Sequence, residues 1–345
     1  MKKRIIISIL IVILALYLLQ CLLMPKYMGD ALEGDILEGT FISEYYKTDM
    51  DFDVLFVGDC ELYENISPQV LWDEYGINSY IRGSAQQLIW QSYYLIEESI
   101  NLGNKPEVVV FNVLSMKYDE PQKETYNRMT LDYMKWSPTK IKDILASMCE
   151  DENFIDYLFP ILRYHSRITE LTADDFKYMF NRDTVTFNGY YMRCDSLAAE
   201  NVPEGRPLAD YTFGDNAYYY LDKMVTLCKE NDIELVLVKA PSLYPYWYEE
   251  WDEQMVDYAA SNDLKYYNFL DVTDEIGLDY STDTYDSGLH LNCAGAEKLS
   301  SYFGEILINE CNVTSRSDDE NLTKIWAENK KAYDAEKKRQ EDLIK

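Results

Sequence analysis

The chain carries a thiol and an imidazole that together could attack an acyl carbonyl. Cys60 follows a short apolar run at residues 54–58, and the sequence has only two histidines, His165 and His290. A thiol attacks as its thiolate, and a neighbouring imidazole can take the proton and pass it to a leaving group. Asp286 precedes His290 by four positions, and a carboxylate in that role holds an imidazole in one tautomer. A cysteine after a strand is otherwise commonly a small buried apolar residue.

Further polar residues and glycines follow the ends of other apolar runs. In an open parallel α/β sheet, ligands bind beyond the carboxyl ends of the strands, so residues at these places are candidates for one shared site. They are Gly83, Gln87, Asn112, Lys239 and Ser242. We expect Gln87, Lys239 and Ser242 to contact substrate, although Lys239 could simply be solvated and Asn112 could simply cap a strand end.

The apolar pattern predicts a parallel sheet between two layers of helices. Short apolar runs are typical of strands, and helical stretches between them make each crossover long enough for parallel pairing. Unbroken hydrophobicity in EVVVF and IELVLV indicates strands that are covered on both faces. We therefore expect a three-layer α/β/α sandwich. The predicted strands are residues 54–58, 78–81, 107–114, 233–239 and 264–270, and the predicted helices include 67–75, 85–102 and one that starts near residue 295.

Two segments break the alternation of strands and helices. Residues 115–212 hold helical pieces and turns inside the expected domain of residues 51–315, and we interpret them as an insertion that forms a cap or substrate wall. His165 lies on an expected helix of this insertion, as a substrate contact or as a structural histidine. The tail at residues 316–345 is highly charged and shows no apolar stripe wide enough for a core, which indicates an exposed helix or partial disorder.

The N-terminus predicts a membrane anchor. Three basic residues precede an uncharged apolar run at residues 5–24, and about 20 such residues span a bilayer as a helix. The basic cluster favours a cytoplasmic N-terminus, so we expect residues 1–25 to form a single-pass anchor, 26–50 a linker, and the main domain to be extracytoplasmic. A cleaved signal peptide is the alternative, but no small-x-small cleavage site follows the apolar run.

Composition excludes several classes of partner and site. The net charge of −29 repels nucleic acid and anionic headgroups from the soluble part. Seven cysteines occur without CxxC or other paired metal-type spacing, so we expect no zinc site, no other metal and no cofactor. The odd count leaves at least one thiol unpaired in a monomer.

The order of these residues resembles the SGNH/GDSL hydrolases over about residues 50–310, outside the insertion. That family has a nucleophile in a Gly-Asp-Ser motif after its first strand, which Gly58-Asp59-Cys60 resembles, and a late aspartate–histidine pair. The most specific piece is D-x-G-x-H-L-N-x-x-G-A-x-K at residues 286–298. This piece is similar to the membrane-anchored subgroup that acylates bacterial surface polymers, including teichoic-acid alanine-transfer and alginate-acetylation proteins. The resemblance implies an SGNH hydrolase-like, flavodoxin-like fold.

The resemblance also implies roles for individual residues. Cys60 is the expected nucleophile, His290 the base and Asp286 its orienting carboxylate, while the amides of Cys60 and Gly83 and the side chain of Asn112 would form the oxyanion hole. The sequence departs from the family in three ways: cysteine replaces serine, three residues rather than two separate the aspartate from the histidine, and no Gly-x-Asn-Asp block surrounds Asn112. Asp283 or Asp274 could therefore replace Asp286 as the orienting carboxylate.

Two functions remain open at this point. The first is an extracytoplasmic esterase or O-acyltransferase that acts on acylated cell-surface carbohydrate through a Cys60 thioester, with a membrane-bound O-acyltransferase as its natural partner. The second is a catalytically degenerate module that binds polymer or scaffolds such a partner. The aromatic run at residues 244–248 could be a sugar-stacking platform or ordinary loop packing.

Overall fold

The computed structural model describes residues 2–26, 40–48, 51–180 and 184–344. Its centre is a five-stranded sheet in which every neighbouring pair of strands is parallel. The strand order β2-β1-β3-β4-β5 is that of the flavodoxin-like doubly wound sheet. The strands are β1 (Val54–Gly58), β2 (Ser79–Gly83), β3 (Val108–Asn112), β4 (Glu234–Lys239) and β5 (Lys265–Asn268).

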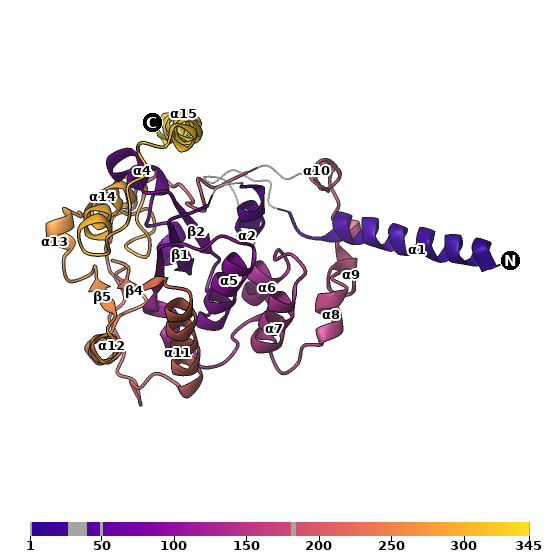
Figure 1. Ribbon diagram of the computed structural model, residues 1–345, viewed down its shortest axis with the longest axis horizontal. Coiled ribbons are helices and arrows are strands. Elements are labelled where there is room, and N and C mark those ends of the chain that lie inside the picture. The colour runs from indigo at the N-terminus through magenta and orange to yellow at the C-terminus, as the bar shows by residue number, and fades with distance from the viewer. Residues whose placement is uncertain (1, 27–39, 49–50, 181–183, 345) are drawn as a thin grey trace.

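Helices cover both faces of this sheet, which confirms the predicted three-layer α/β/α class (Figure 1). One face packs on α5 (Ile89–Asn101), α11 (Asp215–Glu230) and α12 (Glu249–Asn262), and the other packs on α4 (Pro68–Tyr75) and α14 (Cys293–Asn309). Successive strand residues enter opposite cores, so both sets are apolar and the strands lack an exposed face. In β1, for example, Leu55 and Val57 enter one core, and Val54 and Phe56 enter the other.

The predicted insertion forms a separate group of short helices beside α5. Leu131, Ile144 and Tyr157 from the insertion pack against Leu95 of α5 in a small apolar core of their own. The elements are α6 (Glu124–Leu131), α7 (Pro138–Ser147), α8 (Phe154–Leu158), α9 (Ile161–Tyr164), η3 (His165–Thr169) and α10 (Ala173–Lys177). They are preceded by η2 (Val113–Lys117), which packs in the core beside the sheet.

Near the end of the insertion, the turn around Asn188 covers the open edge of the sheet at β2. The amide of Ile81 donates to the carbonyl of Asn188 at 2.9 Å, so a turn of the insertion occupies an unpaired strand edge. Gly189 has a φ of +88°, and a Cβ there would lie 2.0 Å from the Ile81 oxygen. Only glycine therefore permits this approach.

The N-terminal helix α1 (Lys2–Leu23) is long and apolar enough to cross a membrane, and the helix projects from the body (Figure 1). Residues 27–39 and 49–50 of the predicted linker lie outside the described residues. Residues 40–48 of the predicted linker are folded against the body. There α2 (Thr40–Glu44) and η1 (Tyr45–Lys47) bury Phe41, Ile42 and Tyr45.

The charged tail is a helix, and it packs on the body through a narrow apolar stripe. α15 (Glu320–Ile344) buries Leu322, Trp326 and Tyr333. The Trp326 ring stacks on Trp72 of α4, with 5.5 Å between ring centroids. The stripe is narrow, and a few large aromatic side chains supply most of its buried area. The remaining short helices are α3 (Cys60–Tyr63) and α13 (Thr273–Ile276).

Candidate active site

The residues at the carboxyl ends of the first strands are brought to one edge of the sheet. Gly58 of β1 lies opposite Gly83 of β2 in the parallel register, and Asn112 of β3 lies opposite Val238 of β4. Directly after β1, Asp59 caps α3 by accepting a hydrogen bond from the amide of Glu61 at 3.2 Å. Cys60 is consequently the first residue of this short helix, and part of it remains open to solvent.

Gly83 permits the close packing of this edge. A Cβ at Gly83 would lie 2.9 Å from the ring of Tyr63 and 3.1 Å from the carbonyl oxygen of Gly58. Any other residue would push α3 away from β2. The role of the Gly83 amide in an oxyanion hole stays a prediction.

His290 and Asp286 form the close pair that the sequence suggested. Nδ1 of His290 lies 2.7 Å from Oδ2 of Asp286, and the amide of His290 donates to Oδ1 at 2.8 Å. The longer aspartate–histidine spacing is accommodated because Ser287 and Gly288 both have positive φ, at 66° and 99°. The two hydrogen bonds hold the ring so that Nε2 is its free end.

Neither alternative carboxylate takes the place of Asp286. Asp283 accepts a hydrogen bond from Lys298 at 2.6 Å and one from the amide of Asp279 at 2.8 Å. Asp274 is an acidic residue in the first turn of α13. Among the described contacts, only Asp286 and Glu64 bring a carboxylate within ion-pair distance of His290.

The thiol of Cys60 lies beside the imidazole of His290, since the charge of each changes the pKa of the other. Nε2 of His290 is buried and has no nitrogen or oxygen partner in the described part of the chain, and the Cys60 thiol is the group that interacts with this imidazole. Burial raises the pKa of the Cys60 thiol to about 12, and the neighbouring imidazolium opposes that rise. At neutral pH the resting nucleophile is therefore a protonated thiol.

The environment of His290 favours its protonated form. Burial alone would lower the pKa of the imidazole, but the carboxylates of Glu64 and Asp286 and the charge of Cys60 raise it well above its ordinary value. Oε2 of Glu64 lies 3.8 Å from Nδ1 of His290 and accepts a hydrogen bond from Tyr285. Burial raises the pKa of the Glu64 carboxyl as well.

Glu64 and Tyr285 are site residues that the sequence reasoning missed. A signal was present, because the segment DCELYEN places Glu61 and Glu64 within five residues of Cys60, in the turn that follows the first strand. Asn65 was missed in the same segment: its Oδ1 accepts from the amide of Leu291 at 2.8 Å and so ties α3 to the histidine loop.

A buried charge network lies at the same sheet edge. Nζ of Lys239 donates to both carboxylate oxygens of Glu61, at 3.1 and 2.9 Å, and to the carbonyl of Ala240 at 2.7 Å. Nδ2 of Asn112 donates to Asp59 at 3.0 Å and to Glu61 at 3.1 Å. Burial, then the charge of Glu61, raises the pKa of Asp59 to about 6.

This network corrects two expectations. Asn112 has two side-chain hydrogens, and both point at carboxylates, so in this structure it offers no free donor to an oxyanion. Lys239 is fully buried and paired with Glu61, so it is neither solvated nor exposed to a substrate carboxylate. Both residues act on the position of the Cys60 segment through Asp59 and Glu61.

The other expected substrate contacts are also placed differently. Gln87 is buried and donates to the carbonyl of Arg82 at 3.1 Å and to Ser92 at 3.0 Å, so it holds the turn after β2. Ser242 is buried and accepts from Asn65 at 3.4 Å. His165 is exposed in η3, and its Nδ1 lies 2.8 Å from the carbonyl of Leu162 in the adjoining helix. Gln87 and Ser242 are thus buried and hydrogen-bonded within the protein, and substrate contact by these two residues or by His165 stays a prediction.

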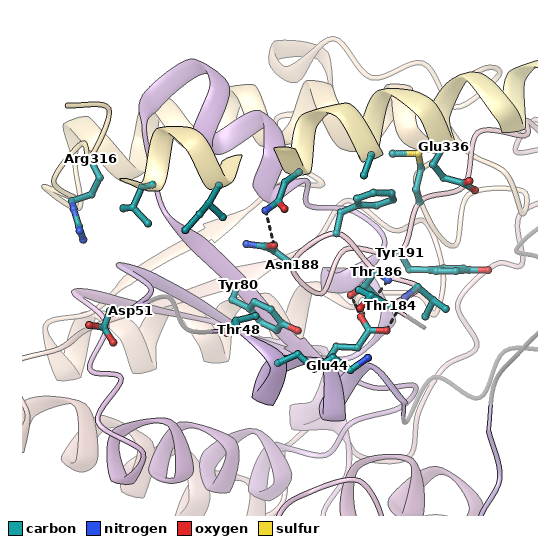
Figure 2. Close-up of a pocket in the computed structure, with 18 of the residues that line it drawn as sticks. Glu44, Thr48, Asp51, Tyr80, Thr184, Thr186, Asn188, Tyr191, Arg316 and Glu336 are labelled. Carbon is teal, nitrogen blue, oxygen red and sulfur yellow. Dashed lines mark hydrogen bonds between the residues drawn. The ribbon is translucent and has the colours of Figure 1, made fainter. Parts of the chain in front are cut away.

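A large cavity lies apart from this site. It has a volume of about 1110 Å³ and lies between α15, the turn around Asn188 and the segment that holds Glu44 (Figure 2). None of Cys60, Asp286 and His290 lines it. Its most buried carboxylate, Glu44, accepts hydrogen bonds from the amides of Val185 and Thr186 at 2.8 and 3.2 Å, which identifies a structural tie.

A smaller groove of about 600 Å³ lies next to the histidine loop. Tyr211, Tyr246 and Tyr248 line it together with Leu243. The amide of Leu243 donates to the carbonyl of Gly288 at 2.7 Å, which joins the groove wall to the loop that carries the imidazole. Part of the aromatic run at residues 244–248 therefore lines an open groove. Aromatic side chains that served only to pack the loop would not need to line it.

No metal site accompanies these residues in the described part of the chain, where no three histidine, cysteine, aspartate or glutamate side chains are grouped to hold an ion.

Comparisons with known proteins find similar solved structures, two of which are described here. No protein-family model matches this sequence, and no curated protein matches it. A Bacteroides fragilis protein described as a "putative acylhydrolase" is 13% identical with a TM-score of 0.38, over 81% of this chain and 100% of the other. A "GDSL-like lipase" from Bacteroides thetaiotaomicron is 12% identical with a TM-score of 0.35, over 78% of this chain and 98% of the other. At these values neither likeness establishes a shared activity.

Proposed function

We propose that this protein cleaves acyl esters through a thioester on Cys60, with His290 as the proton carrier and Asp286 as its orienting carboxylate. One observation supports the proposal above all others. Asp286 accepts one hydrogen bond from Nδ1 of His290 and one from its backbone amide, and Nε2 of the ring is left beside the Cys60 thiol at the carboxyl end of a central strand. A buried ring nitrogen without a partner is costly unless a reacting group uses it.

The reaction has two balanced halves. Sγ of Cys60 attacks the ester carbonyl carbon while neutral His290 takes the thiol proton at Nε2. The amides of Cys60 and Gly83 stabilise the oxyanion, and its collapse breaks the ester C–O bond as His290 returns the proton to the departing alkoxide. Water or a sugar hydroxyl then attacks the thioester carbonyl carbon while His290 takes its proton. Collapse of the intermediate breaks the C–S bond, the acyl product leaves, and His290 returns the proton to Sγ of Cys60.

The proposed substrate is an acylated carbohydrate outside the membrane. The tyrosine-lined groove beside the histidine loop offers flat apolar faces with hydroxyls, a combination that suits sugar rings. The net charge of −29 disfavours polyanionic nucleic acid. A membrane anchor at α1, with the main domain on the extracytoplasmic side, would place the site near a membrane-bound O-acyltransferase as acyl donor or acceptor partner.

A non-catalytic binding module is the second candidate, and one observation favours it. The thiol has a raised pKa of about 12 and the imidazole has a pKa well above its ordinary value, so at neutral pH neither group rests in its reactive form. In that case the tyrosine-lined groove would bind carbohydrate without ester cleavage.

An assay of acyl transfer from p-nitrophenyl acetate to the full-length chain in detergent distinguishes the esterase from the non-catalytic binding module. The proposal predicts release of p-nitrophenol and an acetyl adduct on the peptide that contains Cys60. About one adduct should form per chain. Both should be lost in Cys60→Ala and His290→Ala and retained in Cys149→Ala, which removes another half-buried thiol. Unchanged turnover in Cys60→Ala, or an adduct on other cysteines alone, would overturn the catalytic proposal.

A further inference from the structure

Residues 154–180, in the middle of the insertion, expose an unusual set of apolar side chains. Residues 154–180 contribute six of the seventeen large apolar side chains that are exposed outside α1 in the described chain, including all three exposed phenylalanines. Phe159, Phe176 and Phe180 are 51%, 61% and 70% exposed. Soluble surfaces rarely concentrate such side chains without a contact that covers them. The other three are Ile155, Leu162 and Ile168.

Part of this apolar set lies on the elements that α1 contacts where it meets the body. α1 contacts α9, η3 and α10. Nη1 of Arg167 donates to the carbonyl of Leu23 at 2.7 Å, and buried Lys26 lies 3.7 Å from the carboxylate of Asp175. Figure 1 shows α9 beside the C-terminal end of α1, with α8 next to α9, and both run across the axis of α1. Elements that cross a spanning helix at its end lie along the plane of the bilayer surface.

The charge of the segment fits a lipid surface better than the rest of the chain does. Its exposed ionised side chains are Arg163, Glu170, Asp174 and Lys177, two of each sign, whereas the whole chain has a net charge of −29. Asp175 is buried and paired with Arg167 at 3.0 Å. An anionic bilayer would repel most of this protein, but it would not repel this patch.

We propose that residues 154–180 form a membrane-contact platform that inserts Phe159, Phe176 and Phe180 into the headgroup region around the end of α1. The bilayer is the occupant because α9, η3 and α10 of this segment contact α1, which is long enough to span the bilayer. The platform fixes the body against the membrane at two places, through α1 and through the insertion. It rests on α1 crossing the bilayer and not on the chemistry of Cys60.

Photo-crosslinking in lipid nanodiscs tests the platform in the full-length chain. The photoreactive residue p-benzoylphenylalanine replaces Phe159 or Phe176, and nanodiscs contain phosphatidylcholine and phosphatidylglycerol. Tyr219 of α11 is the matched control, because it is an aromatic residue with a similar exposure of 55%. Mass spectrometry should find about ten times more lipid adduct at the platform positions than at Tyr219.

Position Leu10 within α1 provides the second reference, and it should give lipid adducts whenever α1 is in the bilayer. Platform adducts no more abundant than those at Tyr219, with adducts present at Leu10, would overturn the proposal. Crosslinks between two copies of the chain at Phe159 would also overturn it, because the patch would then be a dimer interface. An absence of adducts at Leu10 would remove the anchor on which the platform depends.

Discussion

Alkylation of Cys60 by iodoacetamide should be slow at neutral pH and should accelerate steadily as the pH rises. The thiolate is the species that reacts. Raising the thiol pKa from 9.0 to about 12 lowers the thiolate fraction at neutral pH about 10³-fold. A more basic thiolate is also more nucleophilic, and a Brønsted slope of about 0.4–0.5 offsets the loss by a factor of about 20. The net expectation is a rate about 50-fold below that of the same thiol with an ordinary pKa.

The labelling rates of folded and unfolded forms of the same protein are compared. Full-length protein in detergent receives short pulses of iodoacetamide between about pH 6 and pH 10, and peptide mass spectrometry measures the label on Cys60. The same protein unfolded in urea provides the reference rate. In His290→Ala the rate should fall further, because the charge of this imidazole lowers the thiol pKa. His165→Ala removes an exposed histidine from the insertion and should leave the rate unchanged.

The contrary result would be fast labelling that hardly changes between about pH 6 and pH 9. Such a profile belongs to a resting thiolate–imidazolium pair. It would show that burial does not dominate the thiol, and the reasoning about the resting state of Cys60 would then be wrong. Loss of that fast labelling in His290→Ala would still support contact between the two side chains.

Three further changes test neighbouring side chains. Asp286→Asn should lower the kcat for p-nitrophenyl acetate by about 10²–10⁴-fold, because the imidazole loses its orienting acceptor, whereas Asp283→Asn should keep a kcat close to that of the unchanged protein. Glu64→Gln removes a carboxylate that raises the pKa of His290, so the imidazole becomes neutral at lower pH. The acid limb of the pH–kcat profile should therefore move to lower pH. A limb at the same pH as in the unchanged protein would contradict the role of Glu64 in raising this pKa. Lys239→Ala leaves a buried carboxylate unpaired and should cost about 3–5 kcal/mol in the free energy of unfolding by urea, and a loss below about 1 kcal/mol would be too small for a buried pair.

The sheet and the position of the site followed from local patterns. Continuous apolar runs predict the central strands, and their order along the chain with helices between them requires parallel pairing. Cys60 and Gly83 were placed at one edge because the carboxyl ends of parallel strands converge there. The aspartate and the histidine could be paired because only four positions separate Asp286 from His290, so their contact depends on one loop.

Contacts between distant side chains could not be predicted in the same way. Lys239 and Glu61 are 178 residues apart, and no local pattern of either residue indicates that a lysine after a strand is buried. The packing of Trp326 on Trp72 joins segments that are even further apart. In α15 the charged residues dominate the composition, so the narrow stripe of large aromatic residues was missed.

The Asn112 side chain provides the sharpest test of how the oxyanion is held. An oxyanion donor contributes about 10²–10³ in kcat, and a structural amide between two buried carboxylates contributes mainly to stability. Since both hydrogens of Asn112 point at Asp59 and Glu61, Asn112→Ala should lower the free energy of unfolding by about 1–3 kcal/mol and change kcat less than about tenfold. Urea unfolding and turnover are measured on the same preparation. A kcat loss above about 10² with unchanged stability would mean that the amide rotates toward substrate during the reaction, and the backbone amides of Cys60 and Gly83 would then not be sufficient.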